Sequence, residues 1–360
     1  MKITVIGAGN AGSTVAAQLA YMGHEVVILR TSNSLHNEHY RVLKETRKIA
    51  VKDEYLGDYE ATVARVSESY AEAIPDAELI IVYVQTTYHE DVVKKIAPYL
   101  KDGQVVLFEP GYLSTAYLLK YCGDKRIISI EAESSPIDCR IVEPCVCNVL
   151  FKNVMNPMGV FPNVCKNEAA RVLDQLKFPY RFTHNVIEAA LHNPNLIVHT
   201  IGAIFSIPRI EYTKGKYWMY KEVFTPCVWN VCEALDAEKM NVMSATGVPK
   251  KQSYVEACQE RNFIDDKRAP LEAFFDYAMN SSPEGPSVPD SRYVTEDVPQ
   301  GLVLLESLGA ALNVPTPTCS ALIDLACAAL QTDFRAVGRT VENLGECFLR
   351  QIQSDSTIVL

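Results

Sequence analysis

The stretch Ile3-Thr4-Val5-Ile6-Gly7-Ala8-Gly9-Asn10-Ala11-Gly12 decides the first half of the fold. It joins a short β-branched run to the pattern G-x-G-x-x-G, and the apolar residues after it recur at the spacing of one helix face. A strand that turns directly into a helix is the context in which this pattern binds a dinucleotide. Gly7 permits the tight turn, Gly9 lets the backbone approach a pyrophosphate, and Gly12 lets helix and strand pack closely. A glycine-rich turn without a ligand is the alternative.

The same turn supplies groups that can hold phosphate. Asn10 and Ala11 open the predicted helix, and the first N–H groups of a helix have no partner within it. These N–H groups and the positive end of the helix dipole favour an anion such as pyrophosphate. We therefore predict that Gly7, Gly9, Asn10, Ala11 and Gly12 bind the cofactor.

The end of the second strand indicates which dinucleotide is bound. The predicted strand Glu25–Leu29 is followed by Arg30-Thr31-Ser32, and no Asp or Glu lies in that turn. An acidic residue there binds the 2′-hydroxyl of NAD, whereas a nearby arginine accommodates the 2′-phosphate of NADP. We predict NADP as the preferred cofactor and NAD as the alternative, with Arg30, Thr31 and Ser32 as contacts. A solvated Arg30 without a ligand is the other interpretation.

Two further strand ends belong to the same predicted edge of the sheet. The buried runs 79–84 and 104–108 are followed by Gln85 and by Glu109-Pro110-Gly111. Ligands of open α/β sheets bind at the carboxyl ends of the strands, so Gln85 and Pro110 are predicted cofactor contacts. A Pro-Gly turn without a ligand is the alternative.

The length and texture of the chain predict two domains. A chain of 360 residues exceeds what one core usually organises. Short β-branched runs alternate with helical patterns up to about residue 181, and helical patterns follow. We predict an α/β Rossmann-type domain with a doubly wound parallel sheet over residues 1–182, extended by the β-like pieces of 127–161. An all-helical substrate domain follows over 183–360, with helices at 186–191, 196–207, 218–241, 253–258, 301–312 and 318–330.

Composition argues against several function classes. With 48% hydrophobic and 22% charged residues, the chain is typical of neither disordered nor polytopic membrane proteins. A net charge of −10 argues against a broad nucleic-acid-binding surface, so bound anions need local sites. The 11 cysteines lack zinc-site spacing and are predicted to be reduced core residues, so we expect no metal. No apolar run could span a bilayer and glycines interrupt the apolar start, so we predict a cytoplasmic protein without membrane contact.

One histidine in the helical half is a candidate for acid–base chemistry. The sequence Asn193-Pro194-Asn195-Leu196-Ile197-Val198-His199 places the start of a helix at Pro194, which leaves His192 before it. His199 has apolar neighbours and is expected to be buried or to line a cleft. A core histidine with a structural role is the alternative.

Charged residues gather at Arg292-Tyr293-Val294-Thr295-Glu296-Asp297-Val298-Pro299, between a Pro- and Ser-rich loop at 280–291 and a predicted helix. A cation and carboxylates at such a junction can bind an acid and orient an imidazole. The alternative is that Thr295 and Asp297 cap the helix opened by Pro299, with Arg292 on the surface.

Taken together, these motifs resemble those of the octopine/nopaline, or opine, dehydrogenase family. The resemblance covers nearly the whole chain, and its most specific parts lie in the helical half. The matching stretches are 7–12, 99–106 with Pro110-Gly111, 133–140, 195–199 with 209–211, and 292–299 with 314–317. Family members have an N-terminal Rossmann domain and a C-terminal helical domain, with the substrate between them.

The resemblance implies an NAD(P)-dependent oxidoreductase that acts on CH–NH donors. An amino acid and a 2-oxo acid would condense to an imine, which NAD(P)H reduces to a secondary amine, and the reverse oxidation is equally implied. By motif position, His199 matches the catalytic histidine and Asp297 the carboxylate paired with it. Arg292 and Asn195 match substrate-binding residues. Small molecules are thus the expected partners, and a homodimer is left open.

The chain departs from the family pattern at Thr200-Ile201-Gly202, where many relatives have prolines. The substrate side of this helix is therefore expected to differ in shape. Two alternatives stay open. One is a 2-oxo-acid or ketone reductase of the ketopantoate reductase type, which typically relies on a lysine in the helical domain. The other is a non-catalytic NADP-binding protein.

Overall fold

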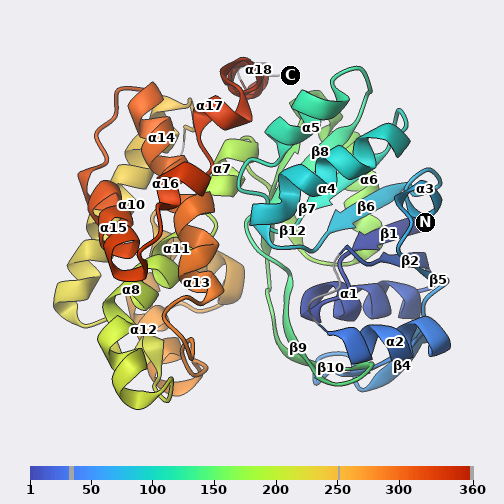
Figure 1. Cartoon of the computed structure of the whole chain (residues 1–360), viewed down its shortest axis with the longest axis horizontal. Coiled ribbons are helices and arrows are strands. Elements are labelled where there is room, and N and C mark those ends of the chain that lie inside the picture. Colours follow the sequence, from blue (N-terminus) through green and yellow to red (C-terminus); the bar gives the residue numbers. More distant parts are fainter. Residues whose placement is uncertain (32–35, 250–251, 357–360) are drawn as a thin grey trace. The chain divides into compact units, whose positions relative to one another are not determined.

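The computed structural model describes residues 1–31, 36–249 and 252–356. The chain separates into two compact units, Met1–Val186 and a second unit that begins at Ile187. The first unit is the α/β domain and the second is the helical domain (Figure 1). The division predicted after residue 182 lies four residues earlier than this one.

An eight-stranded, mostly parallel sheet organises the first unit. Its order is β12-β11-β8-β7-β6-β1-β2-β5, and only β11 and β8 pair antiparallel. The strands are β1 (Lys2–Ile6), β2 (Glu25–Leu29), β5 (Arg65–Ser67), β6 (Leu79–Val82), β7 (Val105–Phe108), β8 (Ile128–Ala132), β11 (Asn156–Phe161) and β12 (Tyr180–Phe182). β1, β6 and β7 each contain four consecutive buried residues, as expected for parallel strands covered on both faces.

Helices connect the strands of this sheet. They are α1 (Asn10–Tyr21), α2 (Asn37–Thr46), α3 (Tyr70–Ala73), α4 (His89–Ile96), α5 (Thr115–Cys122) and α6 (Lys166–Leu176), with single 3₁₀ turns at Thr86–Tyr88, Ala97–Tyr99 and Asn163–Cys165. Only Gly7, Ala8 and Gly9 separate β1 from α1. The strand–turn–helix context that the glycine pattern requires is therefore present.

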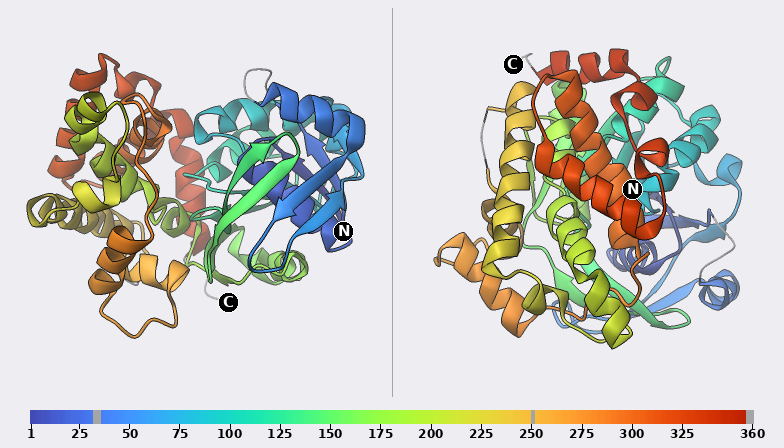
Figure 2. Two further views of the ribbon diagram at one scale, coloured as in Figure 1. Left: turned by 90° about the horizontal axis from the view of Figure 1, so that it is seen from below. Right: turned by 60° about the vertical axis from the view of Figure 1, so that its left-hand side comes forward.

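A second sheet, which the sequence analysis did not predict, packs on α1. Its order is β4-β3-β10-β9, with β3 (Lys48–Lys52), β4 (Tyr59–Thr62), β9 (Ile137–Glu143) and β10 (Val146–Lys152). α1 contacts all four of these strands and also β1 and β2, so it lies between the two sheets. Figure 2 shows the β9–β10 hairpin in green beside the blue strands of this unit.

The expectation for residues 127–161 was therefore only half right. β8 and β11 extend the main sheet, but β9 and β10 leave it: they pair with each other, and β10 also pairs with β3. The burial pattern explains the difference, because buried and exposed residues alternate at the start of β9. Such alternation is typical of a sheet with one covered face, whereas strands inside a parallel sheet are buried on both faces.

The described residues from Ile187 on contain helices and no strand. α7 (Val186–Leu191) crosses the boundary between the units, and the other helices follow. They are α8 (Asn195–Thr213), α9 (Met219–Glu222), α10 (Pro226–Ala245), α11 (Tyr254–Asn262), α12 (Pro270–Asn280), α13 (Arg292–Thr295), α14 (Val303–Ala311), α15 (Pro317–Leu330), α16 (Phe334–Val337), α17 (Val341–Leu344) and α18 (Glu346–Ser356). Within the described ranges, none of the helices has the length and apolar character needed to cross a membrane.

Two features of these helices differ from the sequence expectation. The single helix predicted over 218–241 is divided into α9 and α10, because Thr225 and Pro226 form a new helix start. α12 was not predicted at all, although it begins with proline in the same way.

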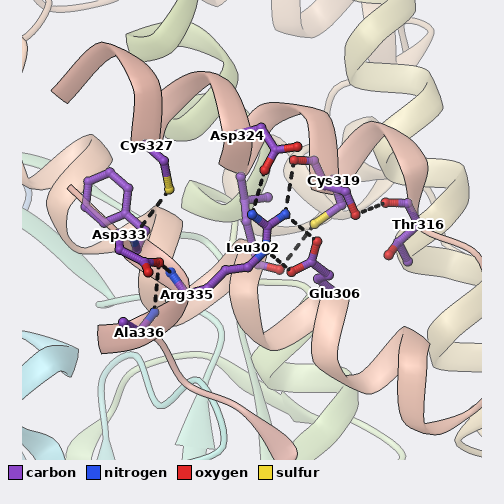
Figure 3. Close-up of polar contacts among 11 residues, drawn as sticks. Leu302, Glu306, Thr316, Cys319, Asp324, Cys327, Asp333, Arg335 and Ala336 are labelled. Carbon is purple, nitrogen blue, oxygen red and sulfur yellow. Dashed lines mark hydrogen bonds and ion pairs between the residues drawn. The ribbon is translucent and has the colours of Figure 1, made fainter. Parts of the chain in front are cut away.

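One arginine ties three of the C-terminal helices together (Figure 3). Arg335 on α16 donates from Nε and Nη2 to the two carboxylate oxygens of Glu306 on α14, both at 2.7 Å. Its Nη1 donates to Asp324 Oδ1 on α15 at 2.6 Å. The hydrogen bonds from Arg335 hold the pKa of the Glu306 carboxyl below its usual range. Because Arg335 offers a planar fork, it can serve both acids at once.

Candidate functional site

The glycine-rich turn leaves open space beside the start of α1. Gly7 has a φ of +116°, and a Cβ there would lie 2.3 Å from the carbonyl oxygen of Tyr83. A Cβ on Gly12 would lie 2.1 Å from the Gly7 oxygen, whereas a Cβ on Gly9 would meet nothing within 4 Å. The first turn of α1 has no acidic residue and no side-chain cap. The turn therefore fits a pyrophosphate, with room at Gly9 and N–H groups at the helix start.

The side chain of Asn10 has a structural partner. Its Oδ1 accepts the backbone N–H of Ile141 in β9 at 2.8 Å. This bond links the first turn of α1 to the second sheet. Asn10 Oδ1 is therefore engaged, and the helix start still presents the backbone N–H groups of Asn10 and Ala11.

Arg30 follows β2 and is held by two neighbours on α2. Its Cζ lies 4.3 Å from the centroid of the Tyr40 ring, a cation–π contact, and its Nη2 donates to Asn37 Oδ1. Burial raises the pKa of Tyr40 to about 12, so the ring under the guanidinium is a neutral phenol. Thr31 is half-buried beside Arg30, and Ser32 lies outside the described residues.

The carboxyl ends of β6 and β7 carry a pair that the sequence analysis missed. The hydroxyl of Tyr83 donates to Oε2 of the buried Glu109. Burial raises the pKa of Glu109 to about 8. The available signal was an acid directly after a wholly buried strand. The predicted contacts lie nearby in the chain, with Gln85 exposed after β6 and Pro110 half-buried after a cis peptide bond.

In the helical unit, His199 and Asp297 form a hydrogen-bonded pair. The distance from His199 Nδ1 on α8 to Asp297 Oδ2 is 2.8 Å, although the residues are 98 positions apart. The side chain of Asp297 is 2% exposed and that of His199 is 12% exposed. A carboxylate can only accept, so Nδ1 carries the proton and Nε2 remains as the nitrogen for proton exchange.

The segment 292–297 presents further groups around this pair. The ring of Tyr293 stacks on the His199 imidazole, with centroids 3.6 Å apart and planes 5° apart. Arg292, whose side chain is 55% exposed, has its Nε 3.3 Å from Oε2 of the buried Glu296. Thus Tyr293 and Asp297 both contact His199, while Arg292 and Glu296 contact each other.

A π-helical turn, Val298–Leu302, follows Asp297 directly and leads into α14. Pro299 lacks the N–H that an α-helical turn would need there, which favours the wider turn. The buried Arg339 braces it by donating its backbone N–H to the Pro299 oxygen at 2.8 Å and its Nε to Gln300 Oε1 at 3.0 Å. The capping alternative for Asp297 is wrong, because its side chain makes no cap and instead holds His199.

Asn195 lies one turn before His199 on α8, on the same face of the helix. Its backbone N–H donates to Asn193 Oδ1 at 3.0 Å. His192 is separate from this group, since it is buried with its Nδ1 3.5 Å from Lys239 Nζ. Across the described part of the chain, no three His, Cys, Asp or Glu side chains gather as metal ligands would.

The departure at Gly202 has a packing explanation. A Cβ at Gly202 would lie 2.7 Å from Sδ of the buried Met219. Glycine therefore allows α9 to approach α8 one turn beyond His199.

Comparison with known proteins assigns both halves of the chain. Residues 182–330 match the model of the NAD/NADP octopine/nopaline dehydrogenase α-helical domain, and residues 3–130 match that of ketopantoate reductase PanE/ApbA. The chain is 27% identical over 348 residues to the opine dehydrogenase of Arthrobacter sp. (strain 1C), covering 95% of this chain and 94% of that protein. The helical half of the chain thus matches the octopine/nopaline dehydrogenase family, and nearly the whole chain is similar to an opine dehydrogenase. The proteins that this family model describes are NAD/NADP-dependent dehydrogenases.

Solved structures of family members share the fold over nearly the whole length. An octopine dehydrogenase with NADH and L-arginine is 19% identical with a TM-score of 0.78, covering 98% of both chains. A yersinopine dehydrogenase with NADP⁺ bound is 17% identical with a TM-score of 0.74, covering 99% of this chain and 98% of that one. The predicted fold class, an α/β domain followed by a helical domain, is therefore confirmed.

The buried Glu109 predicts a specific dependence of stability on pH. The folded carboxyl keeps its proton up to about pH 8, whereas an unfolded glutamate loses its proton near pH 4.3. Between these values the folded state binds more protons, so the free energy of unfolding falls as pH rises, by up to about 1.4 kcal/mol per pH unit, and levels off above pH 8. Glu109→Gln should flatten this fall when urea unfolding is followed by circular dichroism at pH 5.5 and 7.5.

Glu60→Gln, at an exposed glutamate, is the matched control for this measurement. Its free energy of unfolding should fall between pH 5.5 and 7.5 as much as that of the wild type. Both tryptophans, Trp218 and Trp229, belong to the helical unit, so their fluorescence reports the unfolding of that unit. The fluorescence transition should therefore show the same pH dependence in wild type and Glu109→Gln. If the free energy of unfolding followed by circular dichroism fell equally with pH in wild type and Glu109→Gln, the result would contradict a protonated Glu109.

Proposed function

We propose that the chain catalyses the reductive condensation of an amino acid with a 2-oxo acid, and the reverse oxidation. The observation that carries this proposal is the hydrogen bond between His199 and the buried Asp297, which orients an imidazole for proton exchange. The relation to opine dehydrogenases supports the same reaction class. When bound at the glycine-rich turn, the nicotinamide cofactor supplies the hydride.

His199 is proposed to move protons through its Nε2 atom. As the amine attacks the carbonyl carbon, a C–N bond forms and the C=O π bond breaks, and Nε2 relays the proton that the amine nitrogen loses to the carbonyl oxygen, which becomes the hydroxyl of the adduct. A second proton, taken up from solvent by Nε2, is then given to this hydroxyl, so that the C–O bond breaks, water leaves and the protonated imine that accepts the hydride is formed. Asp297 holds Nδ1–H throughout and balances the charge of the doubly protonated ring.

Arg292 and Asn195 are proposed to bind the substrate. A guanidinium can hold a carboxylate through two parallel hydrogen bonds, and Arg292 is on the segment that carries Asp297. Asn195, one turn before His199, offers an amide that can both donate and accept. The acid–base nitrogen and the substrate-binding groups are thus placed by two short segments, 195–199 and 292–297.

NADP is proposed as the preferred cofactor because of Arg30. Its guanidinium lies over Tyr40 and is bonded to Asn37, so it is held at the carboxyl end of β2. No acidic residue follows β2 before Glu38. Gly7, Gly9, Asn10, Ala11 and Gly12 would hold the pyrophosphate, and Arg30 and Thr31 would contact the 2′-phosphate.

We further propose that the enzyme acts in the cytoplasm. All eleven cysteines are free and seven of them are buried, which suits a reducing compartment. Its partners are proposed to be small molecules, and the homodimer stays a prediction.

The first test is a substrate panel. We expect NADPH oxidation, measured as the loss of absorbance, only when a 2-oxo acid such as pyruvate and a suitable amino acid are both present. Secondary amine formation should match the NADPH consumed. NADPH oxidation with the oxo acid alone would favour a ketopantoate-reductase-type reaction, which the match of residues 3–130 makes the second candidate. Tight NADPH binding with no turnover of any pair would favour a non-catalytic protein.

Variants of the histidine–carboxylate pair test the proton-transfer role. His199→Asn and Asp297→Asn should lower kcat by about 10²–10⁴-fold, the usual contribution of general acid–base catalysis. The dissociation constant of NADPH, measured by fluorescence titration, should stay near the wild-type value. Thr295→Ala, an exposed change on the same segment, is the control and should keep wild-type kcat. A loss of folding stability in place of kcat would assign the pair a structural role.

Arg30→Ala tests the cofactor preference. Loss of a charge-assisted contact with the 2′-phosphate should weaken NADPH binding by about 10–100-fold, because such bonds contribute about 1.5–3 kcal/mol. NADH binding should change less than about twofold. Arg41→Ala removes an exposed arginine on the same helix α2 as Tyr40 and should leave both affinities unchanged. Equal losses for the two cofactors would rule out a contact specific to the 2′-phosphate.

A further inference from the structure

The imidazole of His199 is held at its edge by one hydrogen bond and at its face by one ring. The bond to Asp297 restrains Nδ1 at the edge of the ring. Nε2 lies on the far side of the ring, so any tilt of the ring plane that this bond tolerates would move it away from a reacting atom. A second contact, on the face of the ring, limits this tilt and so narrows where the proton-exchanging nitrogen points.

Tyr293 supplies that second contact. Its ring lies 3.6 Å from the imidazole centroid and only 5° from parallel, so the two rings overlap almost face to face. Two neutral aromatic rings prefer an offset or edge-on arrangement. A face-to-face overlap suits a positively charged ring over an electron-rich face, as in other cation–π contacts. The geometry therefore matches the doubly protonated imidazole that the proposed reaction requires.

The backbone around Tyr293 makes this contact rigid. α13 packs against α8, and the fully buried Val294 anchors its single turn. Ser291 precedes the turn, and its carbonyl oxygen accepts the N–H groups of Val294 and Thr295 at 2.9 and 3.0 Å. Tyr293 and Asp297 are four residues apart, so one short segment fixes both the face and the edge of the same imidazole.

We propose that Tyr293 is a positioning residue for His199: its stacked ring sets the plane of the imidazole and so aims Nε2. This proposal rests on the proposed acid–base role of His199. The contribution comes from the aromatic face of Tyr293, so phenylalanine should replace tyrosine and an aliphatic residue should not.

The stack can be tested without substrate by NMR of histidine ring protons in the protein labelled with ¹³C-histidine. A ring stacked on an aromatic face is shielded, so the His199 signals, assigned by their absence in His199→Asn, should lie upfield of those of the other six histidines. Tyr293→Phe should keep this shift and Tyr293→Leu should abolish it. Tyr212→Leu is the control, since Tyr212 is on α8 and is 84% exposed. Unshifted His199 signals in the wild-type protein would overturn the proposal even if Tyr293→Leu did not fold.

The kinetic test uses the substrate pair identified by the panel. Tyr293→Leu should lower kcat about tenfold, with little change in the KM of NADPH, and Tyr293→Phe should restore most of kcat. Loss of the NMR shift without loss of kcat would overturn the positioning role, as would an equal loss in the leucine and phenylalanine variants. Failure of the proposed function looks different, because full activity of His199→Asn would refute the acid–base role while the upfield shift remained.

Discussion

The hydrogen bond between His199 and Asp297 is the contact on which the candidate site of the helical unit depends. It joins α8 to a segment 98 residues later in the chain. Taking a carboxylate and an imidazole out of water costs free energy unless they pair, so the pairing offsets the cost of burying these two groups. The π-helical turn after Asp297 and the bracing of that turn by Arg339 hold the carboxylate from the other side.

In the nucleotide-binding unit, the corresponding constraint is steric. Gly7 and Gly12 bring β1, α1 and the end of β6 closer together than any side chain would permit. α1 is then covered on its other side by the second sheet, and the Asn10 side chain joins its first turn to β9. The start of the helix is thereby held in place before any phosphate arrives, which lowers the entropy lost on binding.

Local patterns identified most of what the structure contains. The glycine turn, the four consecutive buried residues of β1 and the apolar face around His199 were visible because each depends on residues close in the chain. The second sheet was not, because β10 pairs with β3, which lies about 100 residues earlier in the chain, and such pairing follows from long-range packing. Tyr293 was quoted in its motif without a role, since its partner is 94 residues away. The Tyr83–Glu109 pair was missed for a similar reason, because it forms only when β6 and β7 lie side by side.

The position of α1 between two sheets bears on how this protein can be recombined with its relatives. A chimera that exchanged only the glycine turn, α1 and the main parallel sheet would place a foreign α1 against the native β3-β4-β9-β10 surface, without the native bond between Asn10 and Ile141. β3 and β4 come early in the chain and β9 and β10 come late in the unit, so no short cassette contains this surface. The smallest exchangeable block is therefore the whole α/β unit, with the junction placed at residues 183–186, after the last strand.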